Sequence, residues 1–228
     1  MNSDNHKISK TLLVDKPIDW TSFDVVKKIR GLIKKKYNLK KIKVGHAGTL
    51  DPRASGLLII CTGSNTKQMK LFESLNKKYI ATMKMGVVTD SFDSETEEYN
   101  NKPYHHLSNE DIHKTFLEFL GLQEQKPPIF SAIKVKGERL YKKARRGELN
   151  FKLKPRKIII QNLNILEINP PFIQFEVECS KGTYIRSLVN DIGEKLSCGG
   201  YLYALRRVAI GDFKLENAIE MNHIPQSI

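Results

Sequence analysis

The sequence predicts an α+β fold in which helices flank a mixed, largely antiparallel central sheet. Strand-like and helix-like segments alternate along the 228 residues without the regular spacing of βαβ units. Several strand-like segments alternate apolar and polar residues, which is typical of strands with one buried face. The chain is long enough to bury a substantial core. We expect a single domain over residues 1–228.

The first elements are a short strand at residues 11–14 and a helix capped by Thr21 or Ser22. The apolar residues of this helix recur at helical spacing: Phe23, Val26, Ile29 and Ile33. Residues 25–45 contain nine Lys or Arg and no acid. Such a run is usually a solvated face, but the complete absence of acids favours contact with phosphates.

A glycine-rich loop follows at residues 44–56, and its three glycines and one proline exclude a regular helix or a central strand. The loop carries one carboxylate, Asp51, directly before Pro52. The apolar run that follows it, residues 57–61, has the length of a buried strand. An acid on a rigid loop against such a strand is a common way to place a catalytic group. The alternative is a structural loop in which Asp51 only caps its own turn.

The next segments are regular elements. A helix is expected after Gly63, and a strand at residues 77–86 places Tyr79 on the same face as Met83. A capping box at residues 108–111 opens a further helix, which Gly121 is expected to close.

After Pro127-Pro128 comes a basic insertion, about residues 127–157. Between residues 134 and 157 there are eleven basic residues against two acids, with Tyr141 and Phe151 interleaved. The weak apolar pattern predicts a small hairpin or helix that projects like a thumb. Basic residues interleaved with aromatics are typical of an RNA clamp, although a solvated surface insertion is the alternative.

The last third of the chain alternates strands and helices again. Strand-like segments are expected at residues 158–160, 163–168, 173–179 and 201–210, and a short helix at residues 215–221. A helix that begins at Ile185 carries Arg186 in its first turn. An arginine is unfavourable there against the helix dipole, and it therefore needs a carboxylate or a phosphate.

Composition narrows the class of function. The formal net charge of +13 indicates a polyanionic partner, most often nucleic acid. Three distant cysteines and the lack of paired Cys/His spacing give no disulfide framework and no zinc motif. Dinucleotide, zinc-deaminase and nucleophile-elbow motifs are also missing. A cytoplasmic protein without a membrane span, metal or cofactor is expected, with Asp51 as the best candidate for the chemistry.

Ordered motifs resemble those of the TruB family of tRNA pseudouridine synthases. Residues 45–52 (GHAGTLDP) resemble the catalytic loop of the family, and Lys16-Pro17 with Thr21-Ser22 resembles its N-terminal motif. Further matches follow in the family's order: Lys78-Tyr79, Thr89-Asp90, residues 127–134, residues 181–186 and Leu205-Arg206-Arg207. The resemblance covers residues 11–215 and implies a pseudouridine-synthase fold.

The resemblance also implies the reaction. The enzyme would flip uridine 55 of the TΨC arm out of the folded tRNA, cleave its C–N bond and rejoin the uracil through carbon. Asp51 is implied as the nucleophile, by an acylal or a glycal route. Arg186 would hold the Asp51 carboxylate charged and oriented in a bidentate pair. Tyr79 would stack on the flipped base, and its hydroxyl is a candidate for a late proton transfer.

The remaining implied contacts are with RNA. His46 would hold the RNA with its target base extruded, Tyr184 and Leu205 would line the pocket, and Asp90 would bind flanking nucleotides. The basic insertion would contact the RNA backbone through Lys142, Lys143, Arg145 and Arg146.

The sequence departs from the family pattern in three places. Asp19 stands where the family usually has glycine, the acidic loop after Asp90 lacks a glycine, and the chain ends at Ile228. We therefore expect no C-terminal PUA domain, and a monomer whose RNA binding depends more on the insertion and on residues 25–45. The alternative function is a non-catalytic tRNA-binding or RNA-folding chaperone on the same fold. The intact set of Asp51, Tyr79 and Arg186 favours the enzyme.

Overall fold

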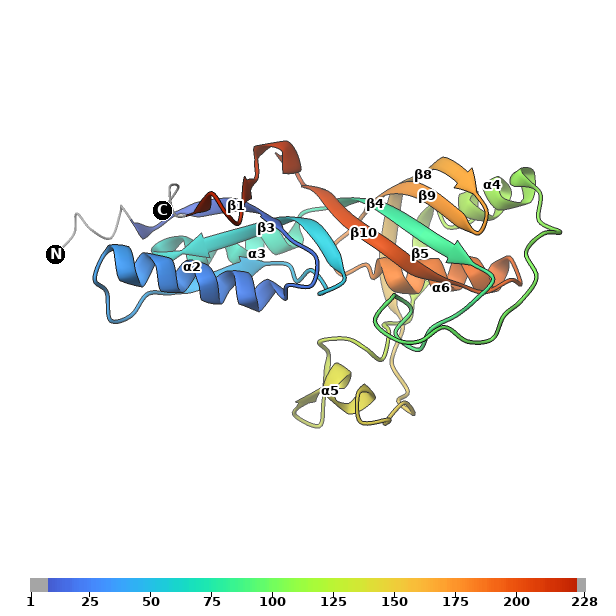
Figure 1. The fold of residues 1–228 in the computed structure, drawn as a ribbon, viewed down its shortest axis with the longest axis horizontal. Helices are drawn as coiled ribbons and strands as arrows, with labels where there is room; N and C mark the ends of the chain where they lie inside the picture. Colours follow the sequence, from blue (N-terminus) through green and yellow to red (C-terminus); the bar gives the residue numbers. More distant parts are fainter. Residues whose placement is uncertain (1–7, 225–228) are drawn as a thin grey trace. The chain divides into compact units, whose positions relative to one another are not determined.

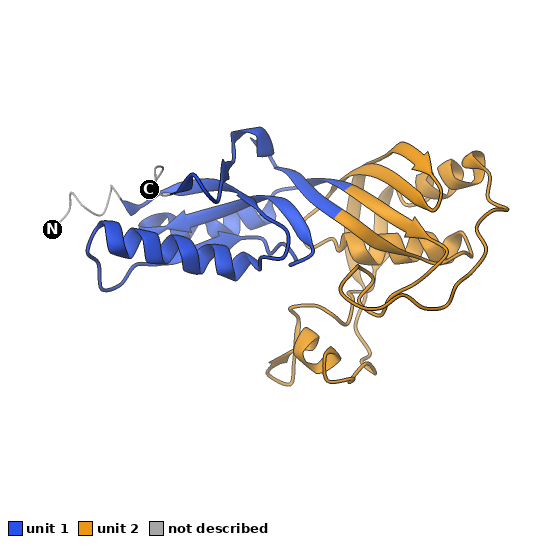
Figure 2. Cartoon of the chain, in the orientation of Figure 1, with its two compact units in different colours: residues 1–80, 205–228 blue, residues 81–204 orange. Residues whose placement is uncertain are grey.

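The computed structural model describes residues 8–224. They form two compact units (Figure 2). Unit 1 comprises the described residues up to Ile80 and from Leu205 onward, and unit 2 comprises residues 81–204. The expectation of one catalytic domain over the whole chain stays a prediction.

Unit 1 contains a mixed sheet with helices on both faces (Figure 1). The strand order is β12-β1-β3-β10, with β2 also paired to β3 and β11 to β10. The β1–β3 and β2–β3 pairs are antiparallel, whereas β1–β12 and β3–β10 are parallel. The elements are β1 (Thr11–Lys16), α2 (Ser22–Lys36), β2 (Val44–Ala47), β3 (Ala54–Thr62), η1 (Gly63–Gln68), α3 (Met69–Ser74), β10 (Gly200–Ile210), β11 (Phe213–Lys214), η2 (Leu215–Asn217) and β12 (Ile219–Glu220).

Strand β3 is buried on both faces, which explains its continuous apolar sequence. Leu58 and Ile60 pack with α2, and the alternate residues Leu57 and Ile59 pack with Phe72 of α3. A fully buried Leu or Ile contributes about 1.5–3 kcal/mol relative to an exposed one. The strand therefore gives a rigid base to the loop that precedes it.

Unit 2 has strand order β10-β4-β9-β8-β5, because β4 and β10 continue into it from unit 1. Strands β8 and β9 form a long antiparallel pair, and β8 pairs with β5 on its other side. The elements are β4 (Lys77–Met85), α4 (Asn109–Leu117), β5 (Gly121–Gln125), β8 (Arg156–Asn169), β9 (Phe172–Cys179) and α6 (Ile185–Lys195). The predicted α+β class with a mixed sheet is confirmed.

The basic insertion projects from the rest of unit 2 (Figure 2). It forms both of the structures that the sequence allowed: a hairpin of β6 (Lys134–Val135) and β7 (Glu138–Arg139), followed by the short helix α5 (Leu140–Ala144).

Several local predictions are confirmed and others are wrong. Thr21 and Ser108 cap α2 and α4 with complete capping boxes. Phe23 does not face the core: the residue is 59% exposed, and the Arg30 guanidinium lies over its ring. Helix α4 ends at Leu117, and Gly121 instead starts β5.

The helix predicted at residues 215–221 is also wrong. This segment makes one 3-10 turn and then strand β12, which pairs in parallel with Val14 and Asp15 of β1. The long-range pairing satisfies the backbone of a segment that a local pattern assigns to a helix.

Candidate active site

The Asp51 loop connects β2 and β3 in unit 1. The two strands form a hairpin in which His46 pairs with Ile60 and Ala47 with Ile59. Gly48 has a φ of +88°, a conformation that side chains rarely adopt. The loop turns at Asp51, whose carbonyl accepts a hydrogen bond from the Ala54 amide at 3.1 Å.

The start of α2 holds the loop from one side. The Ser22 hydroxyl donates to the Leu50 carbonyl at 2.9 Å and accepts from the Leu50 amide at 2.8 Å. The Asp19 amide donates to the Pro52 carbonyl at 2.8 Å. The two residues that flank Asp51 are therefore each fixed by a backbone or buried hydrogen bond.

Arg207 of β10 holds the loop from the other side. Its side chain is buried, and its Nε donates to the Leu57 carbonyl at 2.7 Å. The two terminal nitrogens donate to the carbonyls of Thr49 at 3.4 Å and Gly48 at 3.2 Å. Gly56 permits this arrangement, because a Cβ there would lie 2.3 Å from the Arg207 carbonyl oxygen.

Lys16, at the end of β1, is a second buried cation of unit 1. Its ammonium donates to the carbonyls of Pro17 at 2.8 Å and Trp20 at 2.6 Å. Burial lowers the pKa of Lys16 to about 8, and the Asp51 carboxylate opposes this shift because a nearby negative charge favours the protonated amine. Arg207 adds to the lowering. Lys16 is therefore close enough to Asp51 to sense its charge.

His46 is held in its neutral form. Burial lowers its pKa, and the charge of Arg207 lowers it further. Within residues 8–224, nothing hydrogen-bonds the buried Nδ1 of His46. A neutral imidazole can approach RNA as a donor or an acceptor without an added charge.

Tyr79 lies in the unit 1 part of β4 and is buried at 8% exposure. It shares the buried face of the strand with Met83, as the alternating pattern predicted, and Lys77 also lies on this face. Lys77 donates to the carbonyls of Phe72, Glu73 and Leu75 at the end of α3. The start of β4, where Tyr79 lies, is thus well fixed.

Arg186 is buried in unit 2, and a carboxylate accompanies it as its position requires. Its Nε lies 3.4 Å from Oδ2 of Asp93, and its terminal nitrogens donate to the carbonyls of Ser91 at 3.1 Å and Phe130 at 2.9 Å. Asp93 is also buried and accepts from the Ser91 hydroxyl at 2.6 Å. The pair of Arg186 with Asp51, which lies in the other unit, stays a prediction.

Asp90, three residues before Asp93, is exposed, and its carboxylate accepts a hydrogen bond from the Tyr99 hydroxyl at 2.8 Å. Asp93 is the functional candidate that the sequence did not reveal. The sequence contained one signal for Asp93: Arg186 requires an anion, and the acidic loop after Asp90 could supply one.

Tyr184 immediately precedes α6, and Gln125 fixes its backbone through hydrogen bonds to both its amide and its carbonyl. The Arg156 guanidinium lies 4.3 Å from the Tyr184 ring centroid. Leu205 is half-buried in β10, where it pairs with Ala54 at the end of the Asp51 loop. The roles of Tyr184 and Leu205 as substrate contacts stay predictions.

The four cations expected to contact the RNA backbone differ from one another. Arg146 pairs with Glu138 at 2.7 Å and Glu148 at 2.9 Å, and Lys143 lies near the same two carboxylates. Arg145 pairs with Glu95 at 2.6 Å. For Lys142 the described residues provide no carboxylate within 4.0 Å. The clamp stays a prediction, and three of these four cations already have carboxylate partners within unit 2.

The described residues contain neither a cluster suited to a metal ion nor a membrane-spanning helix. No group of three or more His, Cys, Asp or Glu side chains could hold a metal ion there. Among the helices of residues 8–224, none is both long and apolar enough to cross a membrane.

Comparison with known proteins agrees with the motifs. Residues 34–185 match the TruB family pseudouridylate synthase N-terminal domain, and residues 186–228 match the tRNA pseudouridylate synthase B C-terminal domain. The chain is 48% identical over 222 residues to tRNA pseudouridine synthase B of Phocaeicola vulgatus, covering 97% of this chain and 94% of that protein. It is 45% identical to the protein of the same name from Flavobacterium johnsoniae, over the full length of both.

A solved structure shares the fold. A chain of a Cbf5-Nop10-Gar1 complex superposes with a TM-score of 0.73 at 29% identity, over 98% of this chain and 55% of that one. Together with the ordered motifs and the family matches over residues 34–228, the similarity shows that this chain belongs to the TruB family of pseudouridylate synthases, which are isomerases.

Proposed function

We propose that the protein converts uridine 55 in the TΨC arm of tRNA to pseudouridine. The target base must leave its stack, at a cost of a few kcal/mol, before a protein group can reach its glycosidic bond. Cleavage of the bond between N1 and C1′ and formation of a bond between C5 and C1′ then give an isomer of the substrate. The tRNA substrate also implies a cytoplasmic enzyme.

The observation that carries the proposal is the immobilised Asp51 loop. Ser22 and Asp19 hydrogen-bond the two residues that flank Asp51. Arg207 donates to the carbonyls of Gly48 and Thr49. Fixing a nucleophile before the substrate arrives lowers the activation free energy, because the entropy of positioning it does not have to be lost on the way to the transition state. In our proposal Asp51 acts as the nucleophile, by an acylal or a glycal route.

The other roles follow the family resemblance. Tyr79 stacks on the extruded uracil, His46 helps to keep the base out of its stack, and Tyr184 and Leu205 line the pocket. Arg186 supports the carboxylate of Asp51, and Asp93 in turn holds Arg186 at 3.4 Å.

The test is a pseudouridine map of tRNA treated with the purified protein and with Asp51→Ala. We expect the wild type to modify only position 55, and Asp51→Ala to form no pseudouridine while its tRNA affinity stays within severalfold. Asp212→Ala, which removes an exposed carboxylate between β10 and β11, is the matched control and should be fully active.

Each other result has a defined meaning. Pseudouridine formed by Asp51→Ala would exclude Asp51 as the nucleophile. Modification at another position would exclude uridine 55 as the target. Binding of tRNA by the wild type without any conversion would favour the chaperone instead.

A further inference from the structure

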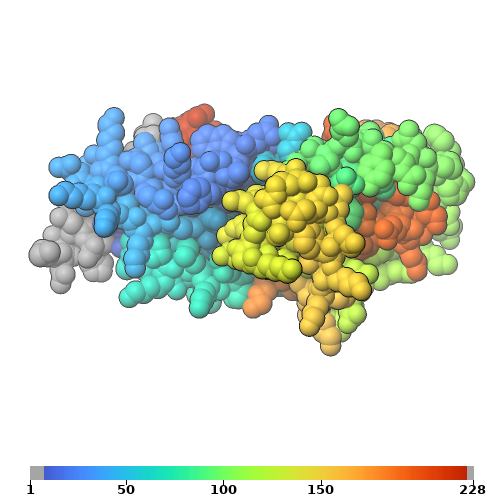
Figure 3. All heavy atoms as spheres, turned by 90° about the horizontal axis from the view of Figure 1, so that it is seen from below, coloured from blue at the N-terminus to red at the C-terminus, as the bar shows by residue number. Residues whose placement is uncertain are grey.

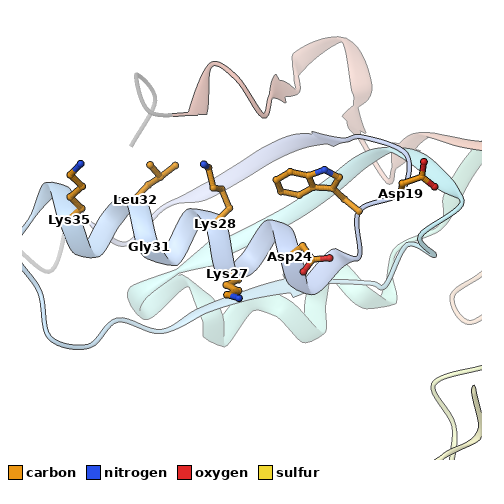
Figure 4. A pocket seen from close by; sticks show the side chains of 8 residues that line it. Asp19, Asp24, Lys27, Lys28, Gly31, Leu32 and Lys35 are labelled. Carbon is orange, nitrogen blue, oxygen red and sulfur yellow. The ribbon is translucent and has the colours of Figure 1, made fainter. Parts of the chain in front are cut away.

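A groove runs along α2 in unit 1 (Figure 4). Four of the residues that line it follow the i, i+3, i+4, i+7 spacing of one helix face. With a rise of 1.5 Å per residue, Lys28 and Lys35 lie about 10 Å apart along the helix. The full lining is Asp19, Trp20, Asp24, Lys27, Lys28, Gly31, Leu32 and Lys35.

The groove begins beside the Asp51 loop. Asp19 lines its first part and donates its amide to the Pro52 carbonyl at 2.8 Å. Ser22, in the first turn of α2, exchanges two hydrogen bonds with Leu50. A polymer chain that reaches Asp51 can therefore continue directly into the groove.

The free charge of the groove is positive. Its two carboxylates are already engaged, Asp24 with the backbone and hydroxyl of Thr21 and Asp19 with the Arg53 guanidinium at 2.7 Å. Among the described residues, no carboxylate lies within 4.0 Å of the ammonium groups of Lys28 and Lys35. Figure 3 shows side chains of the N-terminal part of the chain, drawn in blue, that extend outward from the surface.

Gly31 independently favours a ligand on this face of α2. It lies in the middle of a 15-residue helix, where glycine is strongly unfavourable relative to alanine. No atom lies within 4 Å of where its Cβ would be, so nothing among residues 8–224 requires a glycine. A ligand that approaches the helix backbone closely would require one.

We propose that this groove binds the phosphate backbone of the tRNA strand that leads away from the target uridine. Lys28 and Lys35 contact successive phosphates, Gly31 lets the strand approach the helix, and Trp20 with Leu32 forms an apolar floor. The inference rests on the proposed function, because it takes tRNA as the substrate.

The first test is the salt dependence of tRNA binding by Lys28→Gln/Lys35→Gln. We expect affinity to fall about tenfold at low salt. The slope of log affinity against log salt should flatten by about 1.4, since each phosphate contact on a single strand contributes roughly 0.7. The control Lys70→Gln/Lys114→Gln removes two exposed helical lysines elsewhere and should retain the wild-type slope. Equal slopes for both double variants would overturn the proposal.

The second test uses Gly31 and separates folding from binding. Gly31→Ala should raise the melting temperature, because alanine favours the helix and has room. It should nevertheless weaken tRNA binding severalfold, and Gly31→Gln should weaken it further. Wild-type affinity in both variants would overturn the proposal, since then nothing approaches the helix at this position.

Binding and conversion are measured separately, so that the two proposals fail differently. Wild-type protein that binds tRNA but forms no pseudouridine contradicts the proposed function. Groove variants that bind as tightly as the wild type, while the wild type converts uridine 55, contradict only the groove.

Discussion

The surroundings of the Asp51 loop in unit 1 and the basic insertion of unit 2 both contain cations, but these cations act in different ways. Lys16 and Arg207 are buried and donate to five backbone carbonyls in total, each at 3.4 Å or less. In the insertion Arg146 is exposed and pairs with two glutamates, and the partly buried Lys143 lies near the same two carboxylates.

Buried and exposed cations have different effects on a protein. A buried cation that satisfies carbonyls fixes the backbone, because removing it leaves buried acceptors without donors. An exposed cation paired with a glutamate contributes little to stability and offers less net charge to an RNA. The loop is therefore built for geometry, and the insertion presents less free charge than its composition indicates.

Among the buried and exposed cations, Arg207 gives the largest expected effect. We expect Arg207→Met to lose a few kcal/mol of unfolding free energy, because the buried Leu57 carbonyl costs on the order of 1–3 kcal/mol when its donor is removed, and the part-buried carbonyls of Gly48 and Thr49 add a smaller cost. Urea unfolding measures this loss. The neighbouring variant Arg206→Met removes an exposed pair with Asp15 and should cost at most about 1 kcal/mol.

Arg207→Lys tests whether Arg207 also positions the loop. The lysine keeps the charge, but its single nitrogen cannot reproduce the planar fork through which Nε and both terminal nitrogens of Arg207 donate. We expect kcat to fall by about 100-fold, the effect of a displacement of roughly 1 Å, while KM for tRNA stays within severalfold. A folded Arg207→Lys with wild-type kcat would show that Arg207 contributes only to stability.

Lys16 gives the next largest effect, and it depends on pH. Its pKa is lowered from 10.5 to about 8 in the folded protein, so the folded state loses this proton at a lower pH than the unfolded chain does. Burial of the charged amine therefore costs stability below pH 8, and this cost is relieved between pH 8 and 10.5. At 1.36 kcal/mol per pKa unit the relief is at most about 3 kcal/mol, and solvent screening reduces it.

The measurement compares urea unfolding of the wild type and Lys16→Met from pH 7 to 10.5. We expect the wild type to gain stability relative to the variant as pH rises through this window, because other groups that titrate there are common to both proteins. Lys70→Met is the matched control for loss of an exposed lysine. A difference between wild type and Lys16→Met that does not change with pH would contradict the lowered pKa.

The sequence predicted those parts of the molecule that local patterns encode. The buried run of β3, the alternation in β9 and the capping box of α4 were predicted correctly, because each depends on neighbours in the chain. Strand β12 was missed, because its partner β1 lies at the other end of the sequence.

The candidate site, like the fold, was predicted only where neighbouring residues encode it. The prediction of a shaped loop around Asp51 is confirmed for residues 48–53. It is wrong for residues 44–47 and 54–56, which belong to β2 and β3, because strand pairing accommodates Gly45 and Gly56 there. The burial of Lys16 and Arg207 was not predictable, since lysine and arginine are rarely buried and only the folded backbone brings carbonyls to them. Asp93 was missed because the nearby Asp90 belonged to the motif, whereas only tertiary packing shows which acid meets Arg186.

The smallest expected effect concerns the glutamates of the insertion. The hydrogen bond from Arg146 holds the pKa of Glu138 at about 2, so this carboxylate is ionised at neutral pH. We expect Glu138→Gln/Glu148→Gln to bind tRNA severalfold more tightly at low salt and with a steeper salt dependence, because Arg146 and Lys143 become available to phosphates. Filter binding over a salt series measures both. The control Glu97→Gln/Glu110→Gln makes the same change in net charge outside the insertion. A similar gain in the control would show that net charge alone is responsible, and that the insertion is not an RNA contact.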